Sequence, residues 1–112
     1  MLEWLKKLLG GGGIPSLSPQ EAHKLMQSGA VMLDVRHPDE RQRQHIGGSL
    51  HVPLGDLSRQ ASTLPRDKVI ICQCASGKRS QLAAAQLAAQ GLDVRNLQGG
   101  LAGWQSAGLP VE

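Results

Sequence analysis

A short apolar run that turns into an alanine-rich segment is the feature that most constrains this chain. Residues 69–72 are apolar and rich in β-branched side chains, which is typical of a buried strand. Residues 80–90 are rich in alanine and leucine, which favour a helix. A strand that turns sharply into a helix points backbone N–H groups and the positive end of the helix dipole into the connecting loop. We therefore expect an anion-binding loop over residues 74–79, with Cys74 as a nucleophile.

The composition of this loop favours chemistry at Cys74 over simple packing. A cysteine at a strand end is most often a small buried hydrophobe, but here Cys74, Gly77 and Arg79 share one short turn. A thiol at a helix N-terminus has a depressed pKa and is largely thiolate near neutral pH. Gly77 allows backbone angles that a β-carbon would disfavour, and Lys78 and Arg79 add positive charge at the rim. The candidate site consists of a catalytic residue, Cys74, and a binding loop formed by Ala75, Ser76, Gly77, Lys78, Arg79 and Ser80.

Segments typical of strands and helices alternate along the rest of the chain. The pattern predicts strands at 31–35, within 45–54, at 69–73 and at 93–97, and helices from the Ser18 N-cap to Gly29 and at 38–44, 55–63, 80–90 and 101–107. Short connections between alternating strands and helices imply a parallel sheet with helices on both faces. Ligands bind at the carboxyl ends of such strands, which is where Cys74 falls.

The 112 residues are enough for one ordinary domain, which we expect to span 14–112. Residues 1–9 form a short amphipathic pattern, and the glycines at 10–13 form a linker. The amphipathic segment either docks to a partner or membrane surface, or folds back onto the domain or simply frays, and these interpretations stay open. A net charge of +3 with only two aromatic residues argues against nucleic-acid binding. No apolar run approaches the length of a membrane span.

The two cysteines, Cys72 and Cys74, do not form a disulfide framework. We expect their side chains on opposite faces of the strand, which would place them poorly for a disulfide, a resolving thiol or a metal pair. Core packing is the favoured role of Cys72. One free, exposed thiol indicates a reducing, cytoplasmic compartment. No metal or cofactor is expected.

Polar residues near the second strand are expected to support the site rather than react. Asp34 interrupts an apolar run, so it should accept hydrogen bonds from a neighbouring loop, and together with Arg36 it is assigned to the rim. His45 and His51 are expected to orient the following turn, and His23 is expected to face solvent without a role. The charged residues of the next segment are interpreted as a solvated face: Asp39, Glu40, Arg41 and Arg43.

Several motifs, in order, resemble one family. They are Asp34-Val35-Arg36, Glu40 followed by His45-Ile46-x-Gly48-Ser49, Val52-Pro53-Leu54, Cys74 to Ser80, and Leu97-x-Gly99-Gly100-x-x-x-Trp104. From Ile14 onward the chain resembles a single-domain rhodanese, the sulfurtransferase family with a cysteine persulfide intermediate. The resemblance implies a rhodanese-like three-layer α/β fold, with a mostly parallel five-stranded sheet flanked by helices on both faces. Arg41 and Gln44 occupy positions where the family often has an aromatic residue and a glycine. We expect this difference to affect local packing more than the chemistry.

The resemblance implies transfer of sulfane sulfur from thiosulfate or a persulfide donor to a thiol or cyanide-like acceptor, or to a protein sulfur carrier. Cys74 would attack the donor, and backbone N–H groups of 75–80 would stabilise the persulfide. Ser76 and Ser80 would add hydroxyl donors, while Lys78 and Arg79 would attract an anionic donor. Four residues separate Cys74 from Arg79, whereas related phosphatases have five, so the loop suits a sulfur atom better than a phosphate. A binding or redox-signalling module that docks through its N-terminal segment remains the alternative.

Overall fold

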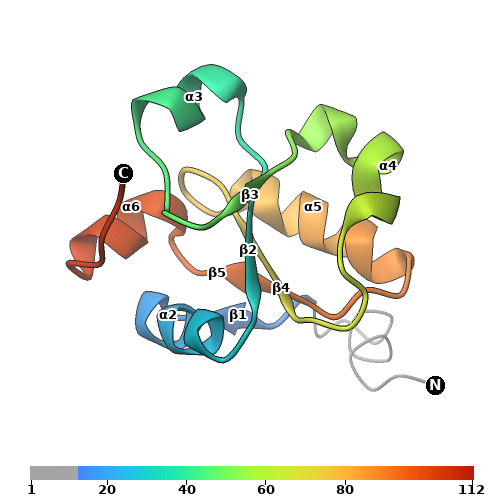
Figure 1. Ribbon diagram of the computed structural model, residues 1–112, viewed down its shortest axis with the longest axis horizontal. Helices are drawn as coiled ribbons and strands as arrows, with labels where there is room; N and C mark the ends of the chain where they lie inside the picture. Colours follow the sequence, from blue (N-terminus) through green and yellow to red (C-terminus); the bar gives the residue numbers. More distant parts are fainter. Residues whose placement is uncertain (1–12) are drawn as a thin grey trace.

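The structure is a computed structural model that describes residues 13–112, so the predicted amphipathic segment and most of its glycine linker lie outside the described residues. Its strands are β1 (Ser16–Leu17), β2 (Val31–Asp34), β3 (Leu50–His51), β4 (Ile70–Gln73) and β5 (Val94–Leu97). Its helices are α2 (Pro19–Gln27), α3 (Pro38–Arg43), α4 (Leu57–Gln60), α5 (Lys78–Ala89) and α6 (Gly100–Ser106), with 3-10 turns η1 (Leu54–Asp56) and η2 (Ala61–Thr63) around α4. Figure 1 shows the arrangement.

The strands form one five-stranded sheet in the order β1-β5-β4-β2-β3, and every pair is parallel. We did not predict β1 from the sequence, because two residues before a helix cap are too few to show the alternation of apolar and polar residues that indicates a strand. β4 lies at the centre, between β2 and β5. All carboxyl ends therefore meet at one edge, where β4 leads into the loop at Cys74 and β2 leads toward α3 (Figure 1).

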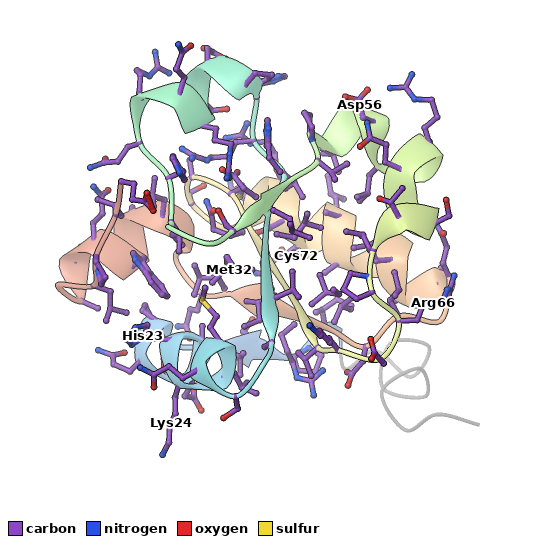
Figure 2. All side chains as sticks on the ribbon, in the orientation of Figure 1. His23, Lys24, Met32, Asp56, Arg66 and Cys72 are labelled. Atoms are coloured by element: carbon purple, nitrogen blue, oxygen red, sulfur yellow. The ribbon has the colours of Figure 1, made fainter. Side chains whose placement is uncertain are left out.

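Two hydrophobic clusters lie on the two faces of the sheet. Along β2, Met32 packs with α2 and α6, whereas Leu33 packs with α4 and α5, because successive strand residues point to opposite faces. Figure 2 shows Met32 extending toward α2. Trp104 of α6 is a large buried member of the α2 side. The predicted three-layer arrangement is thus observed, and the core is built without phenylalanine or tyrosine.

Cys72 and Cys74 lie on the same face of the sheet, in the cluster beneath α5. The prediction of opposite faces is wrong, because it is adjacent strand residues that alternate, and residues two apart share a face. The prediction of an exposed thiol is also wrong, because Cys74 is only 1% exposed. Cys72 (labelled in Figure 2) is fully buried, and burial, with a smaller contribution from the nearby Cys74, raises its pKa to about 12. Cys72 is therefore a neutral core residue.

The start of α2 forms as predicted. The hydroxyl of Ser18 accepts from the Glu21 N–H at 3.1 Å, and the Glu21 carboxylate accepts from the Ser18 N–H at 2.9 Å, which is a complete capping box. His23, expected to face solvent, instead is half-buried with its ring edge-on to Trp104 at 5.6 Å. That contact joins α2 to α6, so the prediction that His23 has no structural part is wrong.

Among the other helices, α3 and α6 differ from the predictions by one residue at one or both ends, and two larger differences occur elsewhere. α5 begins at Lys78, two residues before the predicted start, because Gly77 serves as a left-handed N-cap with φ 110°. Residues 54–63 form a broken helix with a single α turn between two 3-10 turns. In residues 13–112 we find no helix with the length and apolar character that crossing a membrane requires.

Candidate functional site

The sulfur of Cys74 lies inside the loop between β4 and α5. The Gly77 N–H donates to Sγ at 3.0 Å, and the Ser80 hydroxyl lies 3.4 Å from it. Burial opposes ionisation of the thiol, but hydrogen bonds from the Ser80 side chain and from the N–H groups of Ser80, Gly77 and Ser76 outweigh it and lower the pKa of Cys74. The loop therefore provides an environment for an anionic sulfur.

The N-terminus of α6 turns the carbonyl groups of the loop away from the sulfur. The Leu101 N–H donates to the Cys74 carbonyl at 2.8 Å, and the Ala102 N–H donates to the Ala75 carbonyl at 3.2 Å. The buried Gln73 side chain adds a second donor to the Cys74 carbonyl at 2.7 Å. Because these carbonyls are bound outside the loop, the N–H groups that follow them are free to point inward. Sequence reasoning missed this role of α6.

Gly100 explains why α6 can approach so closely. Its φ is +58°, and a β-carbon there would lie 2.4 Å from the Cys74 carbonyl oxygen. Such a distance is impossible without moving the backbone of the loop, so only glycine fits. The Gly99-Gly100 pair was part of the resemblance, and its spacing after the last strand was the signal available in the sequence.

Arg79 is bound to Glu40 rather than free at the rim. Its guanidinium donates to the two carboxylate oxygens of Glu40 at 2.7 and 2.9 Å, joining α5 to α3. These hydrogen bonds, against the opposing effect of burial, lower the pKa of Glu40 to about 2. The interpretation of Glu40 as part of a solvated face is therefore wrong, and Arg79 brings little net charge to the loop. Asp39 and Arg43 are exposed, as expected, and they form an ion pair with each other at 3.7 Å.

Asp34 and Arg36 form a buried ion pair at the carboxyl end of β2. The Arg36 backbone N–H and Nε each donate to Asp34 at 3.0 Å, and Nη2 donates at 2.9 Å. Arg41 also reaches Asp34, at 3.4 Å, and donates to the hydroxyl and carbonyl of Ser49 at 2.9 and 2.8 Å. Arg41 therefore anchors the turn before β3, which corrects its assignment to a solvated face.

The two histidines near β3 bind backbone atoms. His45 Nδ1 lies 3.2 Å from the Arg41 carbonyl oxygen, and His51 Nε2 lies 2.8 Å from the Arg36 carbonyl oxygen. The His45 contact lies at the start of the connection between α3 and β3, where the sequence placed its role. The His51 contact instead joins β3 to the segment between β2 and α3. In the part of the chain that the structure describes, no group of three or more His, Cys, Asp or Glu residues is arranged to hold a metal.

The remaining loop residues differ in what they offer. Ala75 is half-buried, whereas Ser76 and Lys78 are exposed. Ser76 contributes its N–H to the lowered pKa of Cys74, and its hydroxyl makes no hydrogen bond within residues 13–112. Ser80 is buried, and its hydroxyl lies 2.6 Å from Asn96 Oδ1 on β5. Asn96 was not identified from the sequence, because β5 has the sequence Val-Arg-Asn-Leu and a second polar residue in it does not stand out.

The chain is a parallel α/β sheet with a cysteine loop at its carboxyl edge. Comparison with known proteins assigns this combination to one family. Residues 18–107 match the model of the rhodanese-like domain. The chain is 38% identical over 91 residues to thiosulfate sulfurtransferase GlpE of Ectopseudomonas mendocina, covering 80% of this chain and 84% of that protein. The chain belongs to the rhodanese-like domain family.

Solved structures agree with this assignment. A rhodanese-related protein from Thermoplasma volcanium superposes with a TM-score of 0.83 at 31% identity, covering 88% of this chain and 97% of that one. Reduced CoADR-RHD of Bacillus anthracis superposes with a TM-score of 0.82 at 29% identity, covering 89% of this chain and 18% of that much longer one. The predicted fold and the prediction of a rhodanese-type enzyme are confirmed.

Proposed function

We propose that this protein is a sulfurtransferase that moves sulfane sulfur from thiosulfate or a persulfide donor to a thiophilic acceptor through a persulfide on Cys74. The observation that carries the proposal is the enclosed Cys74 sulfur, which accepts from Gly77 N–H at 3.0 Å beside the Ser80 hydroxyl. Relatives named thiosulfate sulfurtransferase support it.

The reaction needs only the thiolate and the loop. The Cys74 thiolate attacks the outer sulfur of thiosulfate, a new S–S bond forms, and the S–S bond of the donor breaks as sulfite leaves with its electron pair. A thiolate or cyanide then attacks the outer sulfur of the persulfide and releases the Cys74 thiolate. Sulfane sulfur is passed on intact, so the cycle needs no external oxidant or reductant.

The loop stabilises the sulfur anion at each stage. The same N–H groups that bind the thiolate, those of Ser76, Gly77 and Ser80, surround the position of the persulfide. Fixed donors in a water-excluding site stabilise charge strongly because they need no reorganisation. The proposed binding loop is therefore Ala75 to Ser80. We propose that the ion pair of Asp34 and Arg36, at and just after the end of β2, supports its rim.

The charge that draws in an anionic donor comes mainly from Lys78. Arg79 is neutralised by Glu40 at 2.7 Å, whereas Lys78 is exposed at the start of α5 and forms no ion pair within the described residues. An exposed ammonium at the rim favours a sulfonate-bearing donor by long-range attraction. Persulfide donors carry less charge and would depend on Lys78 less.

The proposal is tested by intact-mass analysis of the wild type and Cys74→Ser after incubation with thiosulfate, before and after cyanide. Wild type should gain one sulfur atom and lose it to cyanide as thiocyanate, whereas Cys74→Ser should gain none. Cys72→Ala serves as the matched control, because Cys72 is a buried neutral thiol. If neither thiosulfate nor a persulfide donor adds sulfur to the wild type, the proposal is wrong.

We further propose that residues 14–112 form the catalytic domain and that the acceptor is a small thiol or a protein sulfur carrier. A reducing, cytoplasmic compartment fits two free cysteines. The alternative is a redox-signalling or binding module, since a lowered thiol pKa also favours oxidation. Peroxide treatment separates the two: a signalling module would form a sulfenic acid on Cys74 readily and transfer no sulfur.

A further inference from the structure

Asn96 of β5 contacts two of the residues that bind the Cys74 sulfur, Ser80 and Gly77. Its side chain is 2% exposed, with Oδ1 2.6 Å from the Ser80 hydroxyl oxygen and Nδ2 3.4 Å from the Gly77 carbonyl oxygen. Ser80 and Gly77 are the residues within hydrogen-bonding distance of Sγ. The parallel register pairs Asn96 with Cys72, which places it beside the strand that leads into the loop. Asn96 is thus a buried polar residue aimed at the surroundings of the sulfur.

The Ser80 hydroxyl has one proton and three neighbouring acceptors. These are Asn96 Oδ1 at 2.6 Å, the Gly77 carbonyl at 3.2 Å and the Cys74 sulfur at 3.4 Å. When Cys74 is a neutral thiol, its S–H can donate to Ser80 while the hydroxyl donates to Asn96. When the sulfur is an anion, it needs the hydroxyl proton, and the Ser80 oxygen then needs a donor on its other side.

An amide can meet both needs at one position. The oxygen of Asn96 accepts from the hydroxyl in the first state. In the second state the amide rotates, gives up its long 3.4 Å contact with the Gly77 carbonyl oxygen, and presents its NH₂ group to the Ser80 oxygen. A carboxylate could only accept, and an apolar side chain could do neither. The hydrogen bond from the Ser80 side chain is the largest of the effects that lower the pKa of Cys74, so the direction of its proton matters.

We propose that Asn96 is a positioning residue that directs the Ser80 hydroxyl toward the sulfur whenever Cys74 is ionised or carries a persulfide. The persulfide half of this statement rests on the proposed function, whereas the thiolate half does not. The other titratable groups facing the thiol are Cys72 on β4 and Arg79 on α5, which is paired with Glu40 of α3. At the end of β2, Asp34 is paired with Arg36. Asn96 is uncharged and therefore acts through hydrogen bonds.

The test is the pH profile of Cys74 alkylation by iodoacetamide, which reads the thiolate and needs no sulfur donor. Asn96→Leu should move the midpoint of the profile to higher pH and slow alkylation by roughly three- to tenfold at pH values below that midpoint, where the rate follows the thiolate fraction. Asn96→Asp should slow it further, because its carboxylate retains the hydroxyl proton. In a Ser80→Ala background, Asn96→Leu should cause no additional slowing.

Two results would overturn the inference. One is a wild-type pH profile in Asn96→Leu, and the other is equal slowing by Asn96→Leu with and without the Ser80 hydroxyl. Val94→Ala is the matched control, because Val94 is buried on the same face of β5 and should lower the Tm without moving the profile. If Asn96→Leu does not fold, Asn96→Ala gives the same readout. Wild type that alkylates normally but accepts no sulfur would refute the proposed function alone.

Discussion

Gly100 shows how one residue at a distance in sequence determines the geometry of the loop. It brings the N–H groups of Leu101 and Ala102 onto the carbonyls of Cys74 and Ala75, so the loop carbonyls face away from the sulfur. A single missing β-carbon in α6 is therefore a condition for the anion site in the loop after β4.

Gly100→Ala should destabilise the protein and disturb the site together. The β-carbon would lie 2.4 Å from the Cys74 carbonyl oxygen in a residue with φ +58°. Left-handed strain alone costs about 1–2 kcal/mol, and the contact with the loop adds to it. We expect a loss of at least about 2 kcal/mol in unfolding free energy, together with a higher Cys74 pKa, measured by denaturant unfolding and alkylation.

Gly108→Ala is the control for this substitution. Gly108 has φ +77°, but nothing lies within 4 Å of the position of its β-carbon. The variant should therefore lose stability from backbone strain and keep the wild-type thiol pKa. Equal pKa shifts in both variants would contradict the role given to Gly100.

Glu40 makes the stability depend on pH in acid. Its pKa in the folded protein is about 2, lowered from 4.5 chiefly by hydrogen bonds from Arg79. A depressed carboxyl pKa stabilises the fold above the unfolded value, and this stabilisation is lost as the pH falls from about 4.5 to about 2. Glu40→Gln should weaken the pH dependence of unfolding in that interval and leave the rest of the curve unchanged. If wild type and variant lost unfolding free energy equally between about pH 4.5 and about pH 2, the pH dependence would not come from Glu40.

At the scale of the element, the start of α2 shows which structural features can be predicted from the local sequence. The Ser18-Pro19-x-Glu21 pattern predicted a capped helix, and the cap forms because all its partners lie within four residues. The strand–loop–helix unit of β4 and α5 was likewise predictable from local composition. The contacts between Glu40 and Arg79 were not, since these residues are 39 positions apart and meet only when α3 and α5 are placed.

Ser18→Ala should separate helix stability from the chemistry of the site. Loss of an N-cap hydroxyl typically costs about 1 kcal/mol, and Ser18 lies in the capping box of α2, whose Ala22 packs on the face of the sheet opposite Cys74. We expect a lower denaturant midpoint with an unchanged alkylation profile of Cys74. A shifted profile would show that α2 is coupled to the loop, against the layered arrangement.

At the scale of the whole molecule, sequence reasoning recovered the architecture and the position of the loop but erred on what surrounds it. The order of strands and helices predicted a parallel sheet, which places the carboxyl ends at one edge. Burial of Cys74 and the common face of Cys72 and Cys74 were missed, the latter through a wrong use of strand periodicity. The structural roles of Arg41 and Asn96 were not predicted, because their hydrogen-bond partners come from other elements.

Removal of residues 1–12 should leave the domain intact. The five strands, both hydrophobic clusters and the loop around Cys74 lie within 13–112. We expect the shortened chain to match the full one in unfolding free energy and Cys74 alkylation rate. A loss above about 1 kcal/mol, well beyond the few tenths usual for changes away from specific contacts, would show that the first residues contribute to the fold.

The hydrogen bonds from α6 to two carbonyls of the loop have a consequence for the proposed reaction. Ordering a flexible loop around each incoming donor would cost conformational entropy in every catalytic cycle. Here the bonds from Leu101 and Ala102 set the loop's shape before any donor arrives. The loop is preorganised, so in the proposed reaction the energy of donor binding would remain available for breaking the sulfur–sulfur bond of the donor.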